Sequence, residues 1–161
     1  ELDLNENIMV HIAEKSSHLL HDLIRDPFAP KLLDVERTLF NSEPQSMTLK
    51  EEDPFILSSL EHANLSYAPY SKNYAAVGIE TDNGKCFFGR YAENAAFNPS
   101  LLPMQCALAA YARSGMKVSQ IQRAVLIESS KGKISLRNAS INALNAVSKV
   151  QLEHHIAISS H

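Results

Sequence analysis

The sequence lacks the features that define several common classes of protein. None of its 161 residues belong to a run of about 18 apolar residues, the length a membrane-spanning helix requires. No basic segment followed by an apolar one marks a signal peptide. Only two cysteines are present, Cys86 and Cys106, which are too few for a disulfide framework and typical of a reducing cytosol. We therefore expect a cytoplasmic protein with no membrane partner.

Positive charge is also scarce. The chain holds 15 Lys and Arg against 18 Asp and Glu, which gives a formal net charge of −3. Nucleic-acid binding needs a basic patch or stripe, so we expect no nucleic-acid partner. The apolar share of 45% and charged share of 20% are ordinary for a globular protein of one domain, or of one domain and part of a neighbour. The first residue is Glu1 rather than Met, so we expect a processed chain or a fragment.

The first quarter of the chain differs in pattern from the rest. Asn7–Ile12 is a short apolar run that predicts a strand. Ser16 or Ser17 is a suitable N-cap for a helix that ends before Asp26, because proline restricts the residue that precedes it. Irregular structure then follows around three prolines, Pro27, Pro30 and Pro44. We place a domain boundary between about residues 28 and 48.

Alternating helices and strands are predicted from Thr48 onward. A first helix begins either at a capping box over Thr48–Glu51 or at Asp53-Pro54. A hairpin follows, in which Asn83-Gly84 suits a tight turn. Its strands are predicted at 74–81 and 85–91, and later elements are a helix at 102–114, a strand at 121–128, a helix at 138–147 and a strand at 154–158. This order predicts an α/β fold, a three-layer α/β/α sandwich with a mixed sheet.

Three segments resemble the cytidine deaminase family. They are Ala68-Pro69-Tyr70-Ser71, the hairpin turn at Asn83-Gly84, and the run from Gly89 to Phe97, GRYAENAAF. The resemblance covers residues 48–158 in element order and is most specific over 68–97. In its details the chain resembles the carboxy-terminal half of the long, two-domain bacterial cytidine deaminases, in which a second deaminase-fold domain has lost its catalytic residues.

The resemblance implies a defined zinc chemistry, against which this sequence can be compared. In the family, a Zn²⁺ held by one His or Cys and two Cys activates a water, and a Glu two residues after the first ligand shuttles protons. The first ligand follows the ribose-binding Glu by nine positions and precedes the glycine after its helix by thirteen. Counting from Glu93 and from Gly115, both spacings give Leu102. Leu102 and Met104 therefore occupy the ligand and proton-shuttle positions, and neither can do that chemistry.

Two further departures from the family pattern accompany these. The family's Pro-Cys-x-x-Cys would open the next helix near residues 135–140, where the sequence reads SLRNAS without a sulfur ligand. The ribose-binding Asn of the family falls on Tyr91, which leaves Glu93 as the vestige of the ribose site, in a structural role that accepts backbone N–H groups or in contact with a ligand. We expect no catalytic residue and no metal in this segment.

The resemblance also implies a domain organisation and a role. Residues 1–27 would be the tail end of an upstream catalytic domain, 28–47 a linker, and 48–161 a vestigial deaminase-like domain. The zinc would lie in the upstream domain of the parent, which hydrolyses cytidine and deoxycytidine to uridine and deoxyuridine in pyrimidine salvage. This segment would stabilise a homodimer, and Ala95, Ala96 and Phe97 would line the nucleoside pocket of the partner subunit or serve core packing.

Several other interpretations remain open from the sequence. A stand-alone, non-catalytic deaminase-fold scaffold or binding module is the main alternative. A free-standing enzyme would need a nucleophile or metal cluster elsewhere, and an RNA-editing module would need a basic surface. Cys86 and Cys106 are interpreted as buried structural thiols. His154 and His155 are neighbours in a strand and point to opposite faces, which disfavours a shared metal.

Overall fold

The computed structural model describes residues 8–13, 15–24 and 30–159. The chain divides into two compact units, Glu1–Ser42 and Glu43–His161, and each is described by itself. The elements of the first unit are strands β1 (Met9–His11) and β2 (Ser17–Leu19), the short helix α1 (Leu20–Leu23) and the 3₁₀ turn η1 (Pro30–Leu33).

The helix predicted after Ser16 or Ser17 is wrong over most of its length. Ser17–Leu19 instead pairs antiparallel with Met9–His11, with Met9 opposite Leu19, and only the single turn of α1 is helical. The Leu20 N–H donates to the Ile8 carbonyl at 2.8 Å, so the hairpin satisfies the backbone before a helix can extend. The predicted strand at Asn7–Ile12 is present as β1, and Asn7 itself lies outside the described residues.

The second unit is built around a five-stranded mixed sheet in the order β3-β7-β6-β4-β5. β4 runs antiparallel to both β5 and β6, while β6 and β7 are parallel and joined by a helical crossover. Its strands are β3 (Met47–Thr48), β4 (Ala75–Thr81), β5 (Cys86–Arg90), β6 (Ile121–Ser129) and β7 (Leu152–Ser159), and its helices are α2 (Pro54–Asn64), α3 (Pro103–Arg113), the 3₁₀ turn η2 (Val118–Gln120) and α4 (Arg137–Asn145).

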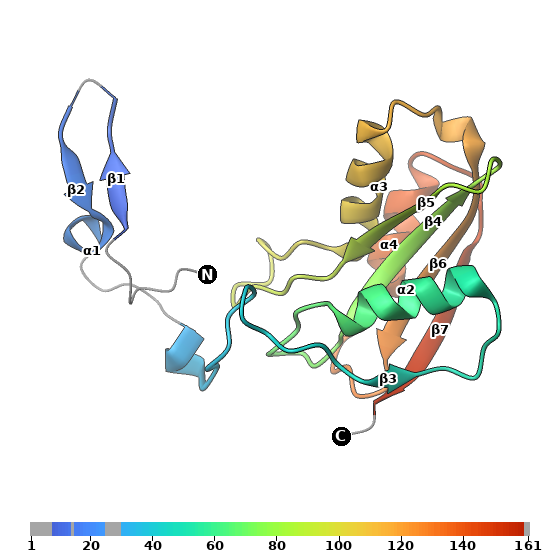
Figure 1. Cartoon of the computed structure of the whole chain (residues 1–161), viewed down its shortest axis with the longest axis horizontal. Helices are drawn as coiled ribbons and strands as arrows, with labels where there is room; N and C mark the ends of the chain where they lie inside the picture. The colour runs from blue at the N-terminus through green and yellow to red at the C-terminus, as the bar shows by residue number, and fades with distance from the viewer. Residues whose placement is uncertain (1–7, 14, 25–29, 160–161) are drawn as a thin grey trace. The chain divides into compact units, whose positions relative to one another are not determined.

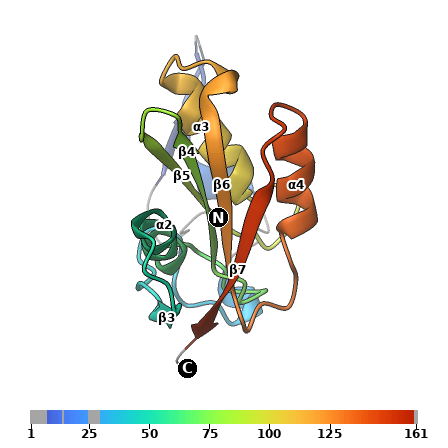
Figure 2. The ribbon, with the colours of Figure 1, turned by 90° about the vertical axis from the view of Figure 1, so that its right-hand side faces the viewer.

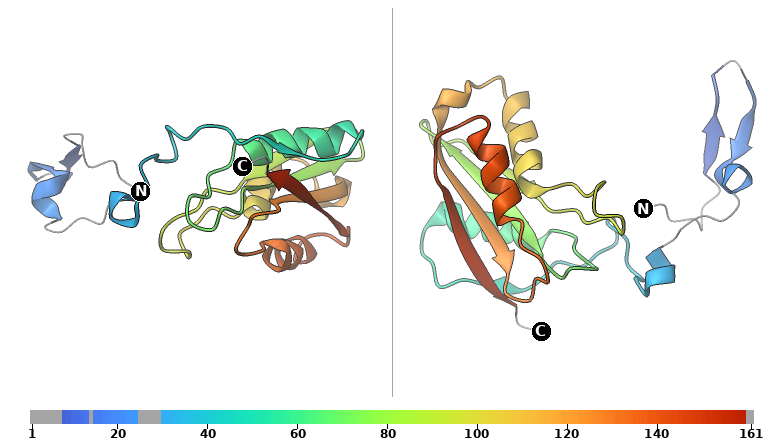
Figure 3. Two further views of the ribbon diagram at one scale, coloured as in Figure 1. Left: turned by 90° about the horizontal axis from the view of Figure 1, so that it is seen from below. Right: turned by 180° about the vertical axis from the view of Figure 1, so that it is seen from behind.

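Helices cover both faces of this sheet, which confirms the predicted three-layer sandwich (Figure 1). α2 lies on one face, and α3 and α4 lie on the other, as views of the sheet along its plane show (Figures 2 and 3). On the α2 face Phe55, Ile56 and Leu60 pack against β6. On the opposite face Met104 of α3 and Leu144 of α4 join a larger buried cluster with β4 and β6.

The start of α2 settles the two alternatives for the first helix of this unit. The Asp53 side chain accepts a hydrogen bond from the Phe55 N–H at 2.9 Å, and Pro54 occupies the first helical position. The capping box over Thr48–Glu51 is therefore wrong, because Thr48 belongs to the short strand β3 and pairs with Ile158. Asp53-Pro54 combines a good N-cap with a proline that needs no N–H donor there.

The predicted hairpin is present, but its turn is not a primed one, because Gly84 and not Asn83 has a positive φ. Gly84 has a φ of 75°, in the left-handed region that glycine tolerates, and the strands on either side pair from Glu80 with Cys86 to Ala76 with Arg90. Across the described part of the chain, no helix is long and apolar enough to cross a membrane.

Candidate functional site

Three loops meet at one end of the sheet and carry the residues that the sequence singles out. They comprise residues 66–73, 91–101 and 129–136. The first two are joined by a bridge between Tyr67 and Ala92, and the Glu93 N–H donates to the Tyr67 carbonyl at 2.8 Å. The third is joined through Lys133, whose N–H donates to the Ser71 carbonyl at 2.8 Å. Backbone hydrogen bonds therefore fix these loops relative to one another.

Glu93 lies between two of these loops and is buried. Its Oε2 accepts hydrogen bonds from the Tyr70 N–H at 2.8 Å and the Ser71 N–H at 3.0 Å. Its Oε1 accepts the Tyr91 hydroxyl at 3.3 Å. Hydrogen bonds from backbone N–H groups to a carboxylate are among the stronger ones in proteins. Glu93 is thus a structural acceptor that closes the turn at Tyr70 and Ser71.

Tyr91 is fully buried, and its ring belongs to the core between the sheet and α3. Burial, together with the nearby charge of Glu93, raises the pKa of its hydroxyl to about 12. The phenol therefore stays protonated at neutral pH and cannot act there as a general base.

The start of α3 is apolar. Leu102 is the N-cap residue and makes no side-chain capping bond, and Pro103 occupies the first helical position. Leu102 is half-buried against the core, and Met104 is fully buried. An N-cap without a side-chain acceptor leaves part of the usual capping energy unused. Packing against the core rather than capping therefore stabilises this helix start.

The start of α4 repeats the arrangement. Leu136 is the N-cap residue, makes no side-chain capping bond, and is 2% exposed. It lies in the same buried cluster as Met104, and Leu102 packs against that cluster. We call Leu102, Met104 and Leu136 the apolar plug. The plug brings together the starts of α3 and α4.

The plug does not fit a zinc ion. Zinc in proteins is bound by thiolates, imidazoles and carboxylates, whereas the plug offers two hydrocarbon side chains and one thioether. Within the three described ranges, no group of three or more His, Cys, Asp or Glu side chains could hold a metal ion. The plug therefore offers zinc no suitable set of ligands.

Ala95, Ala96 and Phe97 lie in the second loop, after a short turn. The Ala96 N–H donates to Asn94 Oδ1 at 3.0 Å, and the Ser100 N–H donates to the Phe97 carbonyl at 2.9 Å. Phe97 is 54% exposed even though these bonds order its backbone. A single exposed ring is common on protein surfaces, so exposure alone does not define a contact surface here.

The sequence reading missed a polar cluster around Glu128, at the end of β6. Glu128 is 2% exposed and accepts hydrogen bonds from Asn73, Ser135, Leu136 and His154. One signal was available, because an acidic residue ends an otherwise apolar strand and buried charges require partners. The partners themselves are scattered along the chain and share no motif.

The predictions for the two cysteines and for His154 and His155 can be compared with the structure one by one. Cys106 is half-buried, and burial raises the pKa of its thiol, which suits a structural role. Cys86 is exposed, so its interpretation as a buried thiol is wrong: it lies on the edge strand β5, next to the hairpin turn. His154 contacts Glu128 and His155 contacts Glu51, and the two rings lie on opposite faces of the sheet as predicted.

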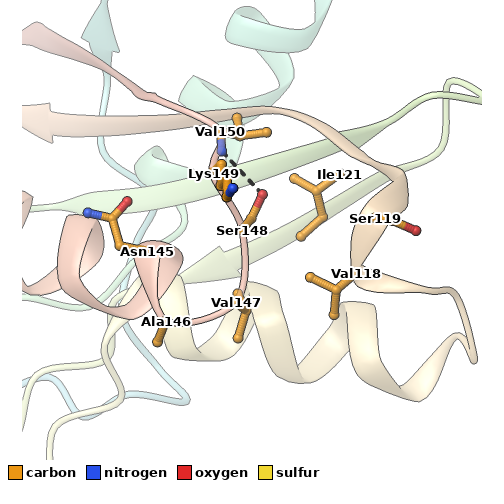
Figure 4. A pocket seen from close by; sticks show the side chains of 9 residues that line it. All are labelled: Val118, Ser119, Ile121, Asn145, Ala146, Val147, Ser148, Lys149 and Val150. Carbon is orange, nitrogen blue, oxygen red and sulfur yellow. Dashed lines mark hydrogen bonds between the residues drawn. The ribbon is translucent and has the colours of Figure 1, made fainter.

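A separate groove of about 660 Å³ lies at the other end of α4. Its walls come from η2, the start of β6 and the connection from α4 to β7 (Figure 4). The lining is mostly apolar or neutral and includes Val118, Ile121, Val147 and Lys149. Since it holds no carboxylate, histidine or cysteine, the groove offers no acid–base or metal chemistry.

The architecture is that of the cytidine deaminase fold. A solved structure of cytidine deaminase from Burkholderia pseudomallei superposes with a TM-score of 0.55, covering 66% of this chain and 84% of that one. The two sequences are 22% identical, so this likeness speaks for the fold alone.

Sequence comparison identifies the family. The profile described as "Cytidine and deoxycytidylate deaminase zinc-binding region" matches residues 20–141. A cytidine deaminase of Shewanella loihica is 50% identical over 154 residues, which are 96% of this chain and 52% of that protein. One of Shewanella oneidensis is 48% identical over 147 residues, which are 91% of this chain and 50% of that protein. The chain therefore belongs to the cytidine and deoxycytidylate deaminase family, and it spans about half the length of these relatives.

Proposed function

We propose that this chain is the non-catalytic, carboxy-terminal half of a long cytidine deaminase. The observation that carries the proposal is the apolar plug. Leu102, Met104 and Leu136 stand at the two helix starts where the family needs metal ligands and a proton shuttle, and they pack into or against the core. Such side chains supply packing energy and no acid–base chemistry.

The exposed apolar side chains of the first unit favour the presence of a neighbouring domain upstream. Among its described side chains none is buried, and Met9, Leu23 and Ile24 are exposed. A two-stranded hairpin is marginal on its own in water and needs a further packing surface. We infer that residues 1–27 complete an upstream catalytic domain, that 28–47 form a linker, and that 48–161 form the vestigial domain. The relatives, about twice as long, leave room for such a domain.

In this proposal the parent protein hydrolyses cytidine and deoxycytidine to uridine and deoxyuridine in the cytoplasm. Zinc bound to the upstream half supplies the activated water, as in zinc deaminases generally. The present segment stabilises a homodimer. Its loop at Ala95, Ala96 and Phe97 lines the nucleoside pocket of the partner subunit, where two small residues permit close approach and the exposed ring forms an apolar wall.

The first test uses the purified chain. Zinc content by elemental analysis and cytidine deamination by ultraviolet absorbance should both be at background. Stoichiometric zinc together with turnover would mean that the positions assigned to Leu102 and Met104 are wrong, and would sink the proposal.

The second test uses the long parent enzyme and asks whether Phe97 contacts substrate. Phe97→Ala should raise KM for cytidine about tenfold, which is about 1.4 kcal/mol of binding, with a much smaller change in kcat. Leu101→Ala is the matched control, because Leu101 is in the same loop and is 57% exposed. Equal effects of the two substitutions would show that the loop acts only through stability.

A further inference from the structure

Glu128 has an unusually complete set of hydrogen-bond donors. Oε1 accepts from Asn73 Nδ2 at 2.6 Å and from the Leu136 N–H at 2.7 Å. Oε2 accepts from Ser135 Oγ at 2.8 Å and contacts His154 Nε2 at 2.7 Å. An ionised carboxylate accepts at about four lone-pair positions, so this carboxylate is saturated. Removing a charge from water is costly unless its partners are arranged in this way.

The arrangement fixes the protonation of His154. The other three groups donate to the carboxylate, and an acceptor on His154 would face an acceptor at 2.7 Å. An ionised Glu128 carboxylate has no proton to donate, so this contact requires a proton on His154 Nε2. This consequence of the geometry is independent of the packing of the surrounding core and can be observed directly.

The donors come from three separate segments of the fold. Asn73 lies in the first loop, Ser135 and Leu136 lie where the third loop meets α4, and His154 lies in β7. The Asn73 N–H also donates to Ser71 Oγ at 3.2 Å, and Ser71 is held by Glu93. Two buried carboxylates are thus connected through a short stretch of backbone, and together they join the three loops of the site.

We propose that Glu128 is a metal-free clamp that holds the third loop and the start of α4 to the first loop and to β7. It acts where zinc-binding members of the family have their second pair of ligands, and this comparison rests on the proposed function. The clamp itself rests on the distances alone. A metal site joins separate segments through its ligands, and the free energy of metal binding contributes to folding. Here one carboxylate with four donors makes equivalent cross-links.

The test compares Glu128→Gln with Glu153→Gln in this chain. Glu153 is the matched control, because it lies on β7 beside His154 and binds Arg123 on the opposite face of the sheet. In the native chain, nitrogen-15 NMR should show His154 protonated on Nε2. In Glu128→Gln the new amide can donate to His154, so the ring should change to the tautomer protonated on Nδ1. Glu153→Gln should leave the His154 tautomer unchanged.

Amide hydrogen exchange gives the second readout. Exchange in residues 129–136 and 70–73 should accelerate about tenfold or more in Glu128→Gln, beyond any change in the β4 amides, and should not do so in Glu153→Gln. If Glu128→Gln does not fold, Ser135→Ala removes one donor and should accelerate exchange in 129–136 alone.

Three results would overturn the clamp. They are a native His154 protonated on Nδ1 only, unchanged exchange of the loops when Glu128 or Ser135 is replaced, and acceleration of the same amides when the native chain is treated with EDTA. None of these measurements depends on turnover. Zinc or activity in the purified chain would contradict the proposed function and leave the NMR result standing.

Discussion

Gly89, within the segment that resembles cytidine deaminases, is the position where one added carbon should do most damage. It lies on β5 directly beneath α3. A Cβ built there would lie 2.1 Å from the Pro103 carbonyl oxygen, 2.3 Å from the Ala107 nitrogen and 2.8 Å from Cys106 Cβ. The first two are backbone atoms of a helix, which cannot move aside as the end of a flexible side chain can.

The loss of unfolding free energy can be worked out from how far Gly89→Ala would push α3 away from β5. Ordinary contact begins near 3.4 Å, so α3 and β5 must separate by roughly 1.3 Å at their closest point. A radial gap of about 0.5–1 Å already forfeits a quarter to a half of a dispersion contact. Met104, Ala107 and Tyr111 all lie on the face that would open. Overpacking usually costs about 1–3 kcal/mol, and we expect about 3 kcal/mol here because backbone must shift.

The assay is urea and thermal unfolding of Gly89→Ala beside Gly84→Ala. Gly84 has a φ of 75° and nothing within 4 Å of its built Cβ, so its substitution isolates the backbone term, about 1 kcal/mol. We expect Gly89→Ala to lower Tm by about 10 °C and to lose near-ultraviolet signal from the aromatic core. A loss of free energy no larger than that of Gly84→Ala would refute the argument from close approach.

Three further outcomes are expected. Leu136→Ala should lower the free energy of unfolding by about 2–4 kcal/mol, because it opens a cavity. Leu101→Ala, at an exposed position, should stay within about 0.5 kcal/mol of the native chain. A loss under about 1 kcal/mol for Leu136→Ala would contradict the apolar plug. Burial, then the charge of Arg90, lowers the pKa of His62 from 6.5, so the folded chain binds fewer protons than the unfolded chain and its stability falls as pH drops below about 6.5. His62→Phe should weaken this pH dependence in urea titrations at about pH 7.5 and 5.5, and an unchanged slope would count against it. Between neutral pH and about pH 10.5, Tyr91→Phe and the native chain should show the same increase in tyrosinate absorbance, because the Tyr91 hydroxyl titrates near 12. An increase that is smaller by one tyrosinate in the variant would contradict this prediction.

The order of elements in the second unit could be predicted because its signals are local. Asn83-Gly84 specifies its own turn, and the apolar run of β6 is typical of a buried strand whatever its neighbours. The two-residue strand β3 carries no such signal, since it exists only through pairing with β7. Ser17–Leu19 likewise has helix-compatible residues but forms a strand because it pairs with Met9–His11. Pairing between distant segments decided both of these outcomes.

The candidate site divides in the same way. The helix start at Leu102 could be predicted from the sequence, because the helical pattern that begins there and the glycine that follows it are local signals. The Glu128 cluster could not, since Asn73 and His154 are 55 and 26 positions from Glu128 and meet it only after the sheet has formed. Contacts of this kind depend on tertiary structure, for which the chain has no periodic signal.

The plug and the two buried carboxylates stabilise the same region of the fold in different ways. Ligands at two helix starts would have to be deprotonated and brought together by an ion whose binding energy is also folding energy. Here burial of Met104 and of Leu136 provides about 1.5–3 kcal/mol each, and the half-buried Leu102 provides less. Hydrocarbon packing has no direction, however, and cannot by itself set where a loop begins. Glu93 and Glu128 supply that direction through hydrogen bonds to backbone N–H groups on both sides of the plug. Under the proposed function, a domain retained for its surface needs both kinds of contact, because the loop that presents Phe97 must keep its position.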